Sequence, residues 1–371
     1  MADNKKFTIN VMMFGGRRSG KTSVLAVMKD SADKKFSDNT NMGVYINSAD
    51  DNTGLILEKK MRELHEYYNQ DDKTKFTKGF TPDDSPTPDK TEYMFDVSLI
   101  DKPKSKIQVN FTDYPGEWLD DSEHYKILSD VMSKSDVILI AVDTPYLMEE
   151  PQNAGDVSSV GRFNDNKNFS EKIAEMVKKS FVVDEDSLRK KMILFVPLKC
   201  EGYYNEINHD LDKMDEVRKK IKKAYEKVIS HITQGENANR YECAIAPIFT
   251  MGNLRFKGFK REEDNNNLVM DSNMKIPVSI YKFDDGAGDL ESKYCEQPLL
   301  YTLVFLLKWA EQTKSKKGKL SSLFNIFDNL ASRFLKYPAA ADFAEKSEFL
   351  RSQLKKGGDG YEIISDPLNF K

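Results

Sequence analysis

One run of eight residues near the N-terminus constrains the fold of this chain more than any other stretch. The run is Gly15-Gly16-Arg17-Arg18-Ser19-Gly20-Lys21-Thr22. It matches the pattern GxxxxGK followed by Ser or Thr, in which glycines shape a loop that wraps phosphate groups. The apolar residues 7–14 before it predict a buried strand, and residues 22–29 after it carry apolar side chains at helical spacing. Strand, loop and helix in this order predict a phosphate-binding loop within an α/β fold.

The groups of this loop are placed for nucleotide chemistry. Successive backbone N–H groups and the positive end of the following helix form a cradle for the α- and β-phosphates. We expect Lys21 to reach the β- and γ-phosphates and the Thr22 hydroxyl to ligate Mg²⁺. The predicted nucleotide-contacting residues of the loop are Gly15, Gly16, Arg17, Arg18, Ser19, Gly20, Lys21, Thr22 and Ser23.

Charge and composition narrow the function classes. The chain has 56 basic and 60 acidic residues, a net charge of −4, which favours no nucleic-acid partner. No apolar run approaches the length of a membrane span, and the N-terminal residues lack the apolar core of a signal peptide. We therefore expect no transmembrane segment and a cytoplasmic location. The three cysteines and four histidines are scattered without the paired spacing of zinc sites or disulfides.

A second motif follows the apolar residues 106–112, which predict another strand. It reads Asp113-Tyr114-Pro115-Gly116-Glu117. A carboxylate at the C-terminal edge of a strand can hold Mg²⁺, usually through water, and a glycine N–H three residues later can contact a γ-phosphate. This motif therefore predicts a magnesium–nucleotide site that Asp113 shares with Thr22.

The rest of the chain predicts one large domain with additions. Further apolar runs predict buried strands that alternate with helices, at residues 135–142, 192–198 and 243–250. Polar residues at about 40–91 and 253–292 interrupt this alternation and are predicted insertions. The domain is expected over residues 5–312, and a C-terminal helical extension with a flexible tail over residues 313–371. Apolar side chains on one face of a helix at 320–335 suit a partner, the domain itself or an anionic membrane surface.

In the order of its strands and motifs the chain resembles the Ras-like core of the TRAFAC class of P-loop GTPases. More narrowly, it resembles the bacterial double-GTPase type, through residues 113–117 and the helix that starts with Cys295-Glu296-Gln297-Pro298. The resemblance covers residues 5–312. It implies a three-layer α/β fold with a mostly parallel sheet and one antiparallel strand, and it implies GTP or GDP and Mg²⁺ as ligands.

The resemblance assigns roles in phosphate chemistry to single residues. Asp113 and Gly116 match the second switch, and Glu117 stands where many GTPases have the glutamine that orients the attacking water. A glutamate accepts a proton or hydrogen bond from that water but donates none toward the γ-phosphate, so we expect hydrolysis to be slow or differently arranged. The threonine that binds Mg²⁺ from the first switch is expected at Thr87 or Thr91.

The guanine-reading element of such proteins, Asn or Thr followed by Lys, any residue and Asp, corresponds to Leu198-Lys199-Cys200-Glu201. Lys199 can stack on the base. The Glu201 carboxylate can accept hydrogen bonds from guanine N1–H and N2–H, whereas adenine offers no matching pair of donors. Leu198 removes one supporting hydrogen bond. Within the phosphate loop, Arg18 is expected either to act in cis on the developing phosphate charge, as an arginine finger does, or to form a surface ion pair elsewhere.

Several functions fit these patterns. The first is a GTP-binding switch with slow hydrolysis, which contacts a protein partner or a second copy of itself through its switch regions. The second is a nucleotide-dependent assembly module with negligible hydrolysis. An ATP-using ATPase or small-molecule kinase is the third, and it gains weight if Glu201 does not contact the base.

Overall fold

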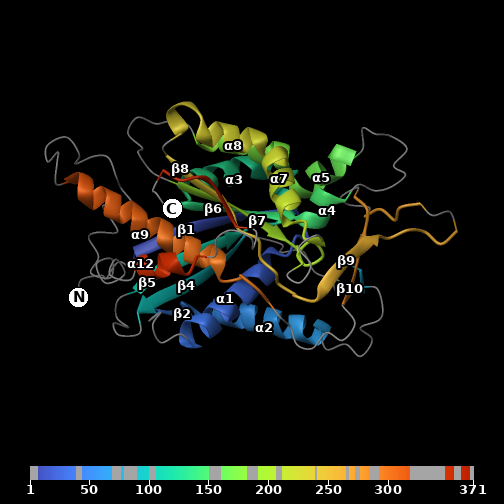
Figure 1. Ribbon diagram of the computed structural model, residues 1–371, viewed down its shortest axis with the longest axis horizontal. Coiled ribbons are helices and arrows are strands. Elements are labelled where there is room, and N and C mark those ends of the chain that lie inside the picture. The colour runs from blue at the N-terminus through green and yellow to red at the C-terminus, as the bar shows by residue number, and fades with distance from the viewer. Residues whose placement is uncertain are drawn as a thin grey trace.

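An eight-stranded sheet lies at the centre of the computed structural model (Figure 1). The structure describes residues 7–38, 44–68, 77–78, 90–99, 106–149, 160–181, 191–205, 211–238, 240–264, 267–271, 276–283, 292–317, 347–354 and 361–367. The strands of this sheet are β1 (Phe7–Phe14), β2 (Val44–Ser48), β4 (Thr91–Leu99), β5 (Lys106–Asp113), β6 (Val137–Asp143), β7 (Lys191–Leu198), β8 (Tyr241–Ile245) and β11 (Glu362–Ser365). They stand in the order β11-β8-β7-β6-β1-β5-β4-β2.

The sheet is mostly parallel, as predicted. β1 pairs in parallel with β5 and β6, and β7 pairs in parallel with β6 and β8. β4 is the antiparallel strand of this core, and β2 pairs antiparallel with it at the edge. Every residue of β6 and β7 is buried, which explains why both sequences are continuous apolar runs rather than alternating ones.

Helices cover both faces of the sheet (Figure 1). They are α1 (Lys21–Asp38), α2 (Asp51–Tyr68), α3 (Ser122–Lys134), α4 (Thr144–Met148), α5 (Val160–Asn168), α6 (Ser170–Ser180), α7 (Met214–Ala224), α8 (Glu226–Thr233), α9 (Gln297–Lys317) and α12 (Ser347–Ser352). One core cluster joins the sheet to α1, α2, α9 and α12, and the other joins it to α3, α6, α7 and α8. The predicted three-layer α/β fold is confirmed.

The two predicted insertions meet in a second, smaller sheet. Its strands are β3 (Thr77–Lys78), β9 (Leu254–Phe259) and β10 (Ser279–Phe283), in the order β3-β10-β9. β10 pairs antiparallel with both neighbours. Figure 1 shows β9 and β10 beyond the end of the central sheet, near one end of α2. Segments about 200 residues apart in the sequence thus form one unit.

The C-terminal segment differs from expectation at one point. Residues 362–365 of the expected flexible tail form β11, which pairs antiparallel with β8 and adds an edge strand to the main sheet. The backbone of β11 satisfies its hydrogen bonds by pairing at that edge. The glycine-rich sequence around β11 does not predict this pairing. The expected helix at 320–335 lies outside the described residues, and the domain boundary at 312 stays a prediction. None of the helices in the described ranges is both long and apolar enough to cross a membrane.

Candidate functional site

The loop between β1 and α1 has the conformation that its glycines permit. Gly20 has a φ of +101°, a left-handed backbone that side chains rarely adopt. At Gly16, an added Cβ would lie 2.0 Å from the carbonyl oxygen of Lys167. The N–H of Ser19 donates to the carbonyl of Gly16 at 3.2 Å and closes a turn. The glycines therefore allow both the turn and the close approach of another segment to the loop.

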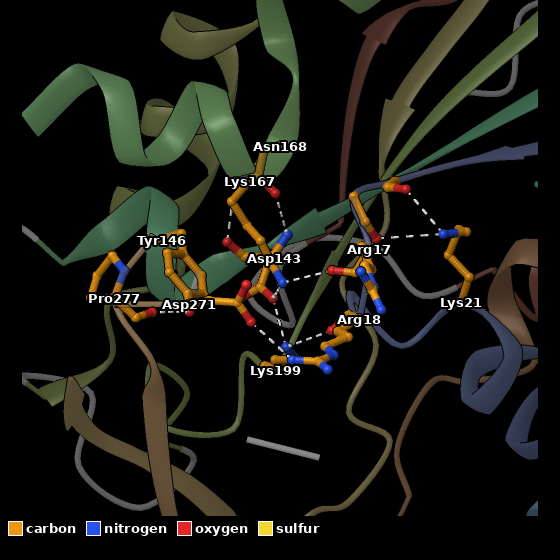
Figure 2. A network of polar contacts seen from close by, with 12 residues as sticks. Arg17, Arg18, Lys21, Asp143, Tyr146, Lys167, Asn168, Lys199, Asp271 and Pro277 are labelled. Carbon is orange, nitrogen blue, oxygen red and sulfur yellow. Dashed lines mark hydrogen bonds and ion pairs between the residues drawn. The ribbon is translucent and has the colours of Figure 1, made fainter. Parts of the chain in front are cut away.

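Lys21 begins α1 and is buried against the loop that precedes it. Its ammonium donates to the carbonyl of Gly15 at 3.0 Å and lies 3.7 Å from Oδ1 of Asp113. Figure 2 shows this lysine beside the phosphate loop. Lys21 and Asp113 belong to two sequence motifs that lie nearly 100 positions apart and that both predicted one site. The structure brings these two residues together.

Asp113 and Thr22 form the oxygen-donor pair that a magnesium site needs. The Thr22 hydroxyl donates to Oδ2 of Asp113 at 3.1 Å. Oδ1 of Asp113 is buried and receives no hydrogen bond from any residue that the structure describes. Burial raises the pKa of Asp113, while nearby Lys21 lowers it. An unsatisfied buried carboxylate oxygen beside a hydroxyl fits a hard cation such as Mg²⁺, so these residues suit the expected metal.

Gly116 and Glu117 lie directly after this pair, in a 3-10 turn at Gly116–Leu119. An added Cβ at Gly116 would lie 2.1 Å from the backbone nitrogen of Arg17 and 2.5 Å from the carbonyl carbon of Gly16. The backbone of the second motif therefore rests on the phosphate loop. Glu117 is half-buried.

Tyr93 and Thr91 border the same site from β4. The buried Tyr93 shares a hydrogen bond with the Thr22 side chain, and burial together with the charge of Asp113 raises the pKa of Tyr93 to about 12. Sequence reasoning did not identify Tyr93, because nothing in the residues around it indicates a hydroxyl contact. Thr91 pairs with Asp113 across β4 and β5, which leaves it adjacent to the candidate metal pair. Thr87, the other candidate, lies outside the described residues.

A pocket opens between the phosphate loop and the residues after β7. It is lined by Ser19, Gly20, Ser23, Val24, Leu64, Leu198, Lys199, Glu201, Thr250, Met251, Leu254 and Tyr281. Oε1 of the buried Glu201 accepts a hydrogen bond from the N–H of Met251 at 3.0 Å, and burial raises the pKa of this carboxyl. Lys199 and Glu201, predicted to contact the base, thus share a pocket with the phosphate loop. The segments predicted as insertions supply Leu64, Leu254 and Tyr281, which sequence reasoning did not connect with the site.

Behind the phosphate loop lies a buried cluster that the sequence motifs did not reveal. Asp143, at the end of β6, accepts a hydrogen bond from Lys199 at 2.6 Å and lies 3.6 Å from the ammonium of Lys167. Lys167 donates to the carbonyl of Arg17 at 2.8 Å, and Lys199 lies 3.3 Å from the carbonyl of Arg18. Figure 2 shows Asp143 between the two lysines. Asp143 at the end of an apolar run was a usable signal, whereas the polar residues around Lys167 show no helical pattern of apolar side chains that would indicate α5.

Arg18 forms an ion pair with a distant segment of the chain. Its guanidinium forms an ion pair with Asp271 at 3.0 Å, and its φ of +58° is left-handed. Two alternatives were predicted for Arg18, a role in phosphate chemistry and an ion pair elsewhere, and the structure has the ion pair. A role of Arg18 in cis stays a prediction.

Comparison with known proteins gives one family. The model of a family described as Double-GTPase 2 matches residues 9–239. This range contains the phosphate loop, the second motif and Lys199 with Glu201. No curated protein matches the chain.

Among solved structures, the chain is similar to two crystal structures of the S. cerevisiae Ski7 GTPase-like domain. The one bound to GTP is 16% identical with a TM-score of 0.35, and the one bound to GDP and inorganic phosphate is 10% identical with a TM-score of 0.31. Each match covers 66% of this chain and 43% of the other, so this chain spans less than half the length of the chains it matches.

Proposed function

Because the chain belongs to the Double-GTPase 2 family, we propose that it binds GTP and GDP with Mg²⁺ and hydrolyses GTP slowly as a nucleotide-dependent switch. The observation that carries this proposal is the contact between the phosphate loop and the second motif, residues 113–117. Lys21 lies 3.7 Å from Asp113, and Thr22 donates to the same carboxylate at 3.1 Å. A structural ion pair alone would not also need Gly116 in contact with the loop backbone.

The proposed roles follow from this arrangement. The loop N–H groups and Lys21 bind the phosphates, and the N–H of Gly116 contacts the terminal γ-phosphate. Thr22 and Asp113 hold Mg²⁺, which when bound neutralises phosphate charge. Glu117 accepts a hydrogen bond from the attacking water, but it cannot donate one to the phosphate as a glutamine does. The expected rate of hydrolysis is therefore low.

Guanine specificity is proposed to come from Glu201. Its buried carboxylate lines the pocket next to the phosphate loop, and Met251 fixes one of its oxygens. A carboxylate in this position accepts from both guanine donors, whereas it would face an acceptor on adenine.

Calorimetric binding of guanine and adenine nucleotides in Mg²⁺ tests the base assignment. We expect GDP and a non-hydrolysable GTP analogue to bind at least about tenfold tighter than their adenine counterparts, since a polar site left unpaired discriminates strongly. Glu201→Ala should remove this preference. Equal or tighter adenine binding by the wild type would overturn the guanine assignment and favour an ATPase or kinase.

The metal assignment predicts a variant with a defect limited to Mg²⁺. Thr22→Ala should lose most of the gain in GTP affinity that Mg²⁺ gives the wild type, because one of the proposed oxygen ligands is removed. Affinity measured in EDTA should change little. Ser23→Ala, one residue along the same helix, is the matched control and should keep the response to Mg²⁺. A normal Mg²⁺ response in Thr22→Ala would show that the cation is held elsewhere.

A second function, an assembly module with negligible hydrolysis, is favoured by Arg18. This arginine is held by Asp271, so its guanidinium is engaged away from the phosphates. Single-turnover phosphate release separates the two proposals. Measurable release that falls at least tenfold in Arg18→Ala supports a switch with Arg18 acting in cis. Release indistinguishable from the buffer control, with nucleotide-dependent dimers in light scattering, supports the assembly module.

A further inference from the structure

Lys167 is a buried lysine that contacts the phosphate loop and is not among the residues that line the pocket beside it. Its side chain is 3% exposed, and its ammonium donates to the carbonyl of Arg17 at 2.8 Å. The same ammonium lies 3.6 Å from the fully buried Asp143. A buried ammonium needs such partners, because an unpaired charge in the interior is strongly unfavourable.

The backbone around Lys167 is fixed as firmly as its side chain. The next residue, Asn168, accepts a hydrogen bond from the N–H of Asp143 at 2.7 Å and donates to the Asp143 carbonyl at 3.3 Å. The carbonyl oxygen of Lys167 occupies the space that a Cβ on Gly16 would need. The end of α5, the end of β6 and the phosphate loop therefore form one interlocked unit (Figure 2).

We propose that Lys167, held by Asp143, is a positioning residue for the phosphate loop: it fixes the Arg17 carbonyl from behind and adds positive charge that favours nucleotide phosphates. This proposal rests on the proposed nucleotide binding, but it does not depend on which base is bound. Lys167 acts through the loop backbone, since its ammonium contacts Arg17 and Asp143 rather than the pocket.

The charges around Lys167 make its effect depend on pH. Burial, with the nearby ammonium groups of Lys199 and Lys21, lowers the pKa of Lys167 to about 7, against the opposing effect of Asp143, which raises it. The Lys167 ammonium also lies over the ring of Tyr146, 5.2 Å from the ring centroid. Anionic phosphates favour the charged lysine, so binding raises its pKa and takes up a proton. Affinity is then greatest below pH 7 and falls as pH rises through about 7 and above.

The test is GDP binding measured by calorimetry in Mg²⁺ from pH 6 to 8.5. A rise of one pKa unit on binding corresponds to a tenfold change in affinity across the transition, so we expect the wild type to bind about tenfold more weakly at pH 8.5 than at pH 6. Lys167→Met should bind more weakly at pH 6 and keep only the pH dependence of GDP itself, which titrates in every variant alike.

Lys191→Met is the matched control. Lys191 is also buried, and its ammonium donates to the carbonyls of Met132 at 3.1 Å and Ser133 at 2.7 Å, at the opposite end of the strands from the phosphate loop. This variant should lose stability but keep the wild-type pH profile. The proposal is overturned if Lys167→Met keeps the wild-type slope, or if Lys191→Met flattens the slope to the same extent.

Proton uptake by the wild type gives a second readout, should Lys167→Met fail to fold. At pH 7.5, calorimetry in two buffers of different ionisation enthalpy should show net uptake of protons on GDP binding, and no uptake would overturn the proposal. If the wild type binds ADP but not GDP, the guanine assignment fails and the same comparison is made with ADP. The pH profile then still decides the role of Lys167.

Discussion

Replacing Lys21 with methionine is expected to weaken binding of GDP or a GTP analogue about 100-fold or more. Lys21 is the buried cation at the start of α1, already aligned by the carbonyl of Gly15 and by Asp113. Each hydrogen bond from a charged donor contributes about 1.5–3 kcal/mol, and a loss of about 3 kcal/mol corresponds to roughly a hundredfold in affinity. Methionine matches the lysine side chain as far as Cε and lacks only the ammonium, so packing changes little.

Calorimetry on Lys21→Met and on a matched control variant measures this effect. Lys29→Met is the control, because Lys29 lies two turns further along α1 and pairs only with the neighbouring Asp33 among the contacts described. It should bind nucleotide as the wild type does. A Lys21→Met protein that is folded and binds within fivefold of the wild type would remove the phosphate loop from the proposed mechanism.

Gly116→Ala is expected to lower both nucleotide affinity and stability. The added methyl group would lie 2.1 Å and 2.5 Å from backbone atoms of Arg17 and Gly16, so the phosphate loop or the second motif must move. Overpacking of this kind costs about 1–3 kcal/mol of folding free energy. Because the displaced atoms belong to the phosphate cradle, we expect affinity to fall tenfold or more as well.

Denaturant unfolding and calorimetry together test this second prediction, with Gly54→Ala as the control. At Gly54, inside α2, an added Cβ would meet Ser48 at 3.7 Å, an ordinary contact. That variant should be as stable as the wild type or more so, by up to about 1 kcal/mol, with unchanged affinity. Gly116→Ala with full affinity would mean that contact between the two motifs has no part in nucleotide binding.

The fold and the two motifs could be predicted because their signals are local. A buried parallel strand is a continuous apolar run, and β6 and β7 are such runs, so the order of elements follows from the sequence. The turn of the phosphate loop depends on the backbone of its own glycines, and its affinity for phosphate depends on the charge of its own lysine. Both can therefore be recognised from the local sequence. For Lys21 and Asp113, knowing that each follows a parallel strand was enough to expect them at the same edge of the sheet.

The parts that could not be predicted depend on contacts between distant segments. Lys167 lies in a polar stretch with no apolar period, and its partner Arg17 is 150 residues away. The hydroxyl of Tyr93 reaches Thr22 only because β4 runs antiparallel beside β5. β11 is too short to show a strand pattern, and its pairing with β8 is set by where the tail crosses the sheet edge.

The small sheet of β3, β10 and β9 joins the two insertions next to the pocket that Leu64 and Tyr281 help to line. Leu64, on α2, belongs to the first predicted insertion and Tyr281, on β10, to the second, and these insertions are joined by a seam where β3 pairs with β10. A molecule that parted this seam would loosen the apolar side of the pocket while Thr22 and Asp113 kept their contact. Under the proposed function, release of a nucleotide would then begin at the base and end at the phosphates.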